Sequence, residues 1–149
     1  MSVILRAYGK DFDVDALLDA STLPVSNAWM RGEPYRDDKP NGKRHKNSAV
    51  FVEVSDADFD QFEQMVDDAI RFLEANADEV RALVTFPGVD EEVMLDFGVE
   101  QGHFAARFNH FPARLVRLCG ELGLALHLSS YMISDSSEGS CAVGSDEEE

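Results

Sequence analysis

Two histidines, His103 and His110, stand seven residues apart in the stretch QGHFAARFNHF and come nearest to a metal-binding pattern. Asp96 or Glu100 could complete a ligand set with them, but a seven-residue gap matches no recurrent ligand spacing. Cys119 is one of two cysteines and falls on the apolar side of a predicted helix, where a cysteine usually packs as a small hydrophobic residue. We therefore expect no metal site, no cofactor and no catalytic residue.

Sequence signatures of the commoner enzymes are missing as well. A phosphate-binding loop ending at Gly42 and Lys43 would need glycine at position 37 and serine or threonine at position 44, where this chain has Asp37 and Arg44. No GxGxxG, GxSxG or HExxH motif occurs. A non-catalytic protein is the favoured reading, and an enzyme stays an open alternative.

One segment reverses the charge of the chain. From Trp29 to Ser48 there are six Lys and Arg against three Asp and Glu, or net +3, whereas the remaining chain has seven against 26, or −19. Such a loop could lie against the acidic side of the chain's own long helix. Alternatively, its arginines could hold a carboxylate or phosphate in bidentate fashion beneath the single tryptophan, which makes Trp29, Arg31, Arg36 and Arg44 candidate ligand-binding residues.

The chain as a whole is strongly acidic, with 13 Lys and Arg, 29 Asp and Glu and a formal charge of −16. Binding a nucleic acid depends on basic side chains that release counterions from phosphates, so we expect no nucleic-acid partner. A negative surface instead attracts basic proteins. No apolar run approaches the roughly 18 residues of a membrane span, and the opening residues form no signal peptide. We expect a cytoplasmic protein without a membrane partner, as a monomer or a homodimer.

Apolar spacing predicts the elements that would position these residues in one domain over residues 1–134. The clearest pattern is a helix from Asp58 to Glu74, where apolar residues recur every three or four positions. Residues 21–47 show no sustained period and contain Pro and Gly, so we predict an irregular loop there. Further helices are predicted at 13–21 and 112–123, and strands at 2–8, 48–55, 79–86, 92–100 and 124–132. The strands at 79–86 and 92–100 would form a hairpin, which residues 101–111 could extend.

This order predicts an α+β fold. From residue 48 it is βαββαβ, the split-βαβ pattern of ferredoxin-like two-layer sandwiches, preceded by an additional N-terminal β-α unit. Residues 135–149 are rich in Ser, Gly and acids and contain no Lys or Arg, so we expect a disordered acidic tail.

Acidic side chains on the solvent side of the long helix, together with an acidic turn, form the candidate partner-binding face: Asp60, Glu63, Asp67, Glu74, Asp90 and Glu91. Repulsion within the turn could also raise one carboxyl pKa enough for acid-base work, although a solvated turn explains these residues more simply.

Four stretches resemble the bacterial Domain of Unknown Function 4279 family: ILRAYGKDFDVDALL, SNAWMRGEP, SAVFVEV and FPARLVRLCGELGLALHLSSYM. The positions that carry the resemblance are Trp29, Gly32, Ser129 or Ser130, and Tyr131. It implies a small, uncharacterised bacterial cytoplasmic α+β protein and carries over no catalytic residue.

Together these features predict a non-catalytic, acidic protein-interaction module that binds a basic protein, for example an immunity-type inhibitor of a basic toxin. The alternative is a small anionic-ligand binding protein or enzyme, with its site under the basic loop from Trp29 to Lys46.

Overall fold

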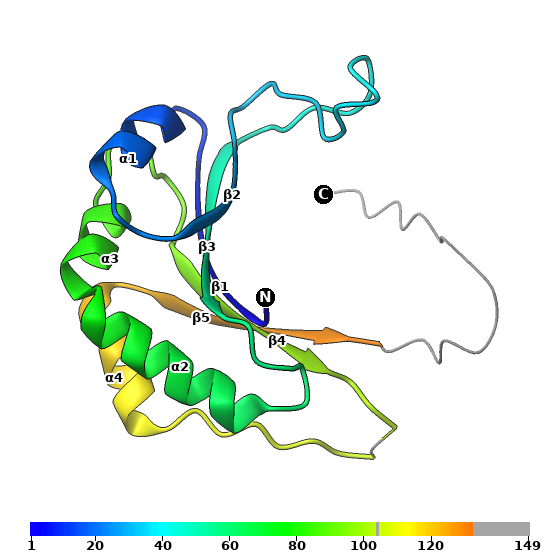
Figure 1. Cartoon of the computed structure of the whole chain (residues 1–149), viewed down its shortest axis with the longest axis vertical. Coiled ribbons are helices and arrows are strands. Elements are labelled where there is room, and N and C mark those ends of the chain that lie inside the picture. The colour runs from blue at the N-terminus through cyan, green and yellow to red at the C-terminus, as the bar shows by residue number, and fades with distance from the viewer. Residues whose placement is uncertain (104, 133–149) are drawn as a thin grey trace.

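In the part of the chain that the structure describes, an open, mixed five-stranded sheet forms the frame, and four helices cover one of its faces (Figure 1). The computed structural model describes residues 1–103 and 105–132. The sheet order is β2-β3-β1-β4-β5, in which only β4 and β5 are parallel neighbours within the described chain. The strands are β1 (Val3–Gly9), β2 (Val25–Trp29), β3 (Ser48–Ser55), β4 (Met94–Glu100) and β5 (Ala125–Tyr131).

The helices pack their apolar sides on the inner face of the sheet. Strand β1 alternates as a half-covered strand should: Val3, Leu5 and Ala7 are fully buried, while the residues between them lie on the helix-free face and are partly exposed. The helices are α1 (Val14–Ala20), α2 (Phe62–Ala75), α3 (Ala77–Val84) and α4 (Ala113–Leu122).

Two predicted helix boundaries are confirmed. The Asp13 carboxylate accepts a hydrogen bond of 3.0 Å from the backbone N–H of Ala16 and so caps α1. Gly123 ends α4 with a φ of 77°, in the left-handed region that glycine adopts without steric cost.

The predicted strand at 79–86 is wrong, because these residues form most of α3 and its end. Val80 and Leu83, three positions apart, are fully buried, whereas Ala82 is exposed, so packing selects the helical period over the alternating one. The loop predicted over 21–47 contains β2, an edge strand whose polar and half-exposed residues carry no clear alternation. The extension predicted at 101–111 forms no strand in the part of it that is described.

The predicted α+β two-layer sandwich is confirmed, whereas the ferredoxin-like detail is not. Strands β3 and β4 are both antiparallel to β1, so they run parallel to one another with β1 between them, and α2 and α3 connect them as a split βαβ unit. The additional N-terminal strand is therefore the centre of the sheet. The predicted disordered tail, 135–149, lies outside the described residues. No helix among the described residues has the length and apolar character needed to cross a membrane.

Candidate functional site

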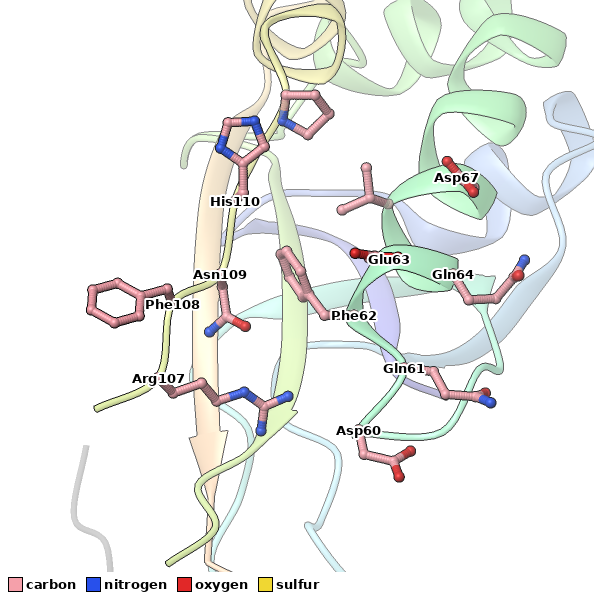
Figure 2. A pocket seen from close by; sticks show the side chains of 12 residues that line it. Asp60, Gln61, Phe62, Glu63, Gln64, Asp67, Arg107, Phe108, Asn109 and His110 are labelled. Atoms are coloured by element: carbon pink, nitrogen blue, oxygen red, sulfur yellow. The ribbon is translucent and has the colours of Figure 1, made fainter. Parts of the chain in front are cut away.

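A broad hollow lies between the start of α2 and the segment that leads into α4 (Figure 2). Its volume is about 780 Å³, and three of the predicted acidic residues, Asp60, Glu63 and Asp67, line it. We call it the acidic hollow, and its lining comprises residues 60–64, 66, 67, 107–110 and 112.

The floor of the acidic hollow is aromatic and belongs to the core. The Phe62 ring lies 5.9 Å from that of Phe97 in β4 and 5.3 Å from that of Phe111, measured between ring centroids. The Phe97 and Phe111 rings are themselves 5.2 Å apart at 71°. Edge-to-face packing of this kind is favourable, so it fixes the segment before α4 against the start of α2.

The net charge of the acidic hollow is negative. Three carboxylates stand against one guanidinium, that of Arg107, which donates hydrogen bonds to the backbone oxygens of Glu100 and Phe59 and so braces the rim. Within the described part of the chain, Asp60, Glu63 and Asp67 enter no ion pair and no side-chain hydrogen bond. Their charges therefore remain available to a ligand or partner.

The other three predicted acids are placed elsewhere. Glu74 forms an ion pair with Arg114 of α4. Asp90 accepts a hydrogen bond of 3.0 Å from the backbone N–H of Lys10, and Glu91 accepts one of 3.4 Å from the Asn47 amide. These two acids lie beyond the end of β1 that is opposite to the acidic hollow, and a seven-residue strand separates its ends by about 20 Å. The six predicted acids do not form one face.

The basic segment folds as a hairpin that extends from β2 and β3 (Figure 1). We call residues 31–46 the basic hairpin. Trp29 anchors it: the indole N–H donates to the Asn47 oxygen at 3.0 Å, and the indole ring stacks on His45 at 4.4 Å. Tyr35 covers the other side of His45 at 4.1 Å. Gly32 enters the hairpin with a φ of 92°, so a side chain there would strain the backbone.

A smaller cavity of about 430 Å³ lies on the helix-free side of the sheet, beside Trp29. Of the four predicted ligand-binding residues, Trp29 alone lines it; the other lining residues are Tyr8, Tyr35, His45, Lys46, Asn47, Glu91 and Met94.

The three predicted arginines are engaged in other contacts. Arg31 pairs with Asp11 at 3.8 Å, and Arg36 pairs with Asp38 at 2.8 Å. Arg44 donates to the backbone oxygens of Gly32 and Pro40 at 2.6 and 2.8 Å. The ion pairs of the basic hairpin are therefore made with its own residues and with Asp11, and not with the acids of α2.

A polar network that the sequence analysis missed crosses the middle of the helix-free face. Arg6 of β1 pairs with the buried Asp96 of β4 at 2.8 Å, and the Ser129 hydroxyl donates to the same carboxylate at 2.8 Å. The Arg6 guanidinium also lies 4.8 Å from the centroid of the Phe51 ring. Burial lowers the pKa of Arg6, but a hydrogen bond with Tyr8 and the charge of Asp96 outweigh it and raise that pKa. The only signal in the sequence was a charged residue in the middle of each of two apolar strands.

Burial shifts the pKa values of two side chains that could otherwise react, Cys119 and His45. Cys119 is buried in the core as predicted, and burial raises the pKa of its thiol to about 11, so the reactive thiolate is rare at neutral pH. Burial also lowers the pKa of His45. Residues 1–103 and 105–132 contain no group of three or more His, Cys, Asp and Glu side chains arranged to hold a metal ion.

Comparison with known proteins adds no relative: the chain matches no protein-family model, and no similar protein was found among curated proteins or solved structures. The resemblance to the Domain of Unknown Function 4279 family stays a prediction.

Proposed function

We propose that this protein is a non-catalytic interaction module whose acidic hollow receives a basic segment of a partner protein. The observation that carries the proposal is that Asp60, Glu63 and Asp67 line one hollow together with the ring of Phe62, which packs on Phe111. A lysine or arginine side chain complements both features, the carboxylates and the ring. Its apolar stem can cover an aromatic ring while its charged head stays near carboxylates.

Charge outside the hollow supports the same partner class. A formal charge of −16 accelerates encounter with a cationic protein, and this acceleration weakens as salt screens it. Because charge complementarity of this kind steers association and sets specificity, an immunity-type inhibitor of a basic toxin is the specific form that we propose.

The test uses a lysine- and arginine-rich peptide as the probe. Asp60→Asn, Glu63→Gln and Asp67→Asn together remove three charges at the acidic hollow. The matched control, Asp15→Asn, Asp19→Asn and Glu121→Gln, removes three charges from exposed sites on α1 and α4. We expect the first triple variant to weaken binding about tenfold or more, whereas the control changes it only slightly, since each lost rim contact costs up to about 1 kcal/mol. Equal losses in the two variants would show that net charge alone drives binding.

A second candidate is a small-ligand site in the cavity beside Trp29. The aromatic walls of Tyr8, Trp29 and Tyr35 favour it. Lys46 and Glu91 both line the cavity, and the three arginines do not, so its charge gives little support to an anion specifically. Because Trp29 is the only tryptophan, its fluorescence reports occupancy directly. A screen of anionic metabolites that changes neither the fluorescence nor the melting temperature would dismiss this candidate.

A further inference from the structure

The two edges of the sheet differ in how well they are protected. Strand β2 has five residues, and its register with β3 is interrupted between Val25 and Asn27. Strand β5 has seven residues in unbroken parallel register with β4, and no described strand pairs with its outer side. Short or irregular edges resist further pairing, whereas a long regular edge invites it.

Exposed apolar side chains gather at β5. Leu128 is 41% exposed, Tyr131 48% and the adjoining Met132 84%, and Val116 of α4, the helix that leads to this strand, is 48% exposed. Leu128 pairs in register with Phe97, so it faces the helix layer at the open side of the sheet. Tyr131, three positions further along the strand, lies on the opposite face against Phe59 and Gly98, so exposed apolar side chains flank this edge of the sheet on both faces.

The same edge carries no formal charge. Ala125–Tyr131 contains no Asp, Glu, Lys or Arg, although the chain as a whole carries −16. Natural edge strands are often protected by lysine or another charge, and β5 has none. A strand that pairs with its own copy sets like residues close to one another, so a charge on it would meet a like charge. The uncharged β5 avoids this local repulsion and therefore suits a second copy of the chain.

We propose that β5 pairs with β5 of a second copy of this chain, antiparallel about a two-fold axis at Leu128. This is the middle residue of the strand, so the axis sets Leu128 against its own copy and His127 against Ser129. Identical strands are self-complementary in this orientation, which closes the assembly at a dimer. The two five-stranded sheets become one continuous sheet, and Leu128 lies against its own copy at the axis.

Sedimentation velocity of the full chain tests the dimer. At about 100 μM protein, a concentration that populates even dimers of micromolar Kd, we expect a species of twice 16.5 kDa. Raising salt to about 1 M, where the Debye length falls to roughly 3 Å, should strengthen the dimer because the copies repel each other. Binding of a basic partner should weaken under the same change, so the two proposals fail separately. A monomer at both salt concentrations overturns the dimer, including the case in which residues 133–149 or another protein occupy β5.

Two variants of opposite charge at Leu128 test the position of the proposed two-fold axis. Leu128→Lys and Leu128→Glu should each be monomeric, since each sets like charges against one another, and an equimolar mixture of the two should recover the dimer. Leu18→Lys on α1 is the control, because Leu18 has the same exposed fraction of 41%. Far-ultraviolet circular dichroism verifies that each variant is folded. A dimer that persists in Leu128→Lys, or a mixture of folded variants that stays monomeric, overturns the proposed axis.

Discussion

The acidic hollow and the basic hairpin carry opposite charges, and the structure uses those charges in opposite ways. In the basic hairpin, the guanidinium groups of Arg36 and Arg44 are engaged by a neighbouring carboxylate and by backbone oxygens. In the acidic hollow, Asp60, Glu63 and Asp67 have no such partners among the described residues. A count of charges in a sequence therefore does not reveal which charges are available for binding.

The Arg6–Asp96 network on the helix-free face should be more sensitive to substitution than either of these two regions. Arg6→Met leaves the buried Asp96 carboxylate with Ser129 as its remaining side-chain partner, and we expect a loss of about 3 kcal/mol in the free energy of unfolding. Urea denaturation measures it. The double variant Arg6→Met/Asp96→Leu should recover most of the loss, because both charges are then gone, and a double variant as unstable as the single one contradicts this account.

Removal of the hairpin anchor should have the next largest effect. Trp29→Ala deletes the stack on His45 and the hydrogen bond to Asn47, and we expect about 2 to 3 kcal/mol of destabilisation for this half-buried ring. Trp29→Phe keeps an aromatic ring and should lose about 1 kcal/mol, the usual value of one hydrogen bond. If the hairpin is independent of the acidic hollow, peptide binding there stays unchanged in both variants.

Glycine to alanine changes in the basic hairpin and in α4 should have opposite effects on stability. Gly32→Ala in the basic hairpin imposes a φ of 92° on alanine with no neighbouring atom in the way, so backbone strain alone should cost about 1 kcal/mol. Gly120→Ala in α4 also meets open space and should stabilise the protein by up to about 1 kcal/mol through helix propensity. Thermal melts of the two variants in parallel compare them, and shifts of the same sign would refute the distinction.

Acidification should weaken the stack around His45. Burial lowers the pKa of this imidazole in the folded state, so the unfolded chain binds the proton more readily. Its contribution to stability is therefore fully present above the unfolded pKa of about 6.5, and it is lost as the pH falls below that value through the lower pKa of the folded state. His45→Phe keeps a ring between Trp29 and Tyr35 and should reduce the decrease in melting temperature between neutral and mildly acidic pH. An identical decrease in the variant assigns the effect to other groups.

The smallest effect on stability should come from the acidic hollow itself. Neutralising Asp60, Glu63 and Asp67 breaks no contact within the described chain, so the free energy of unfolding should change by no more than about 0.5 kcal/mol. A large loss of stability would mean that these carboxylates serve the fold and not a partner.

The sequence predicted the elements whose apolar spacing follows from burial. It failed for the elements whose structure depends on contacts with other segments. The helix now called α2 was evident because Val66, Ala69 and Leu73 repeat at helical spacing, and all three are buried. Residues 79–86, which belong largely to α3, were predicted as a strand because the apolar residues of EVRALVTF alternate almost as regularly as they recur at helical spacing. Only packing against α4 distinguishes the helix from the strand. For the candidate site, Glu63 and Asp67 followed from their common face of α2, whereas Asp60, predicted on the same helix, lies in the turn before α2 begins at Phe62. The contribution of residues 107–112, and the engagement of the arginines, depend on contacts between distant segments that no local pattern encodes.

The central position of β1 has a consequence for how the molecule assembles. Its two neighbours, β3 and β4, are drawn from far along the chain, so the sheet cannot grow outward from a local hairpin at this strand. Pairings between distant segments incur the entropy of closing long loops before they return any stability, and they slow the search for the native state. On a translating ribosome, Val3, Leu5 and Ala7 have no strand partner until β3 has emerged, and the other edge of β1 stays open until β4 follows, so this apolar strand is exposed to chaperones during synthesis.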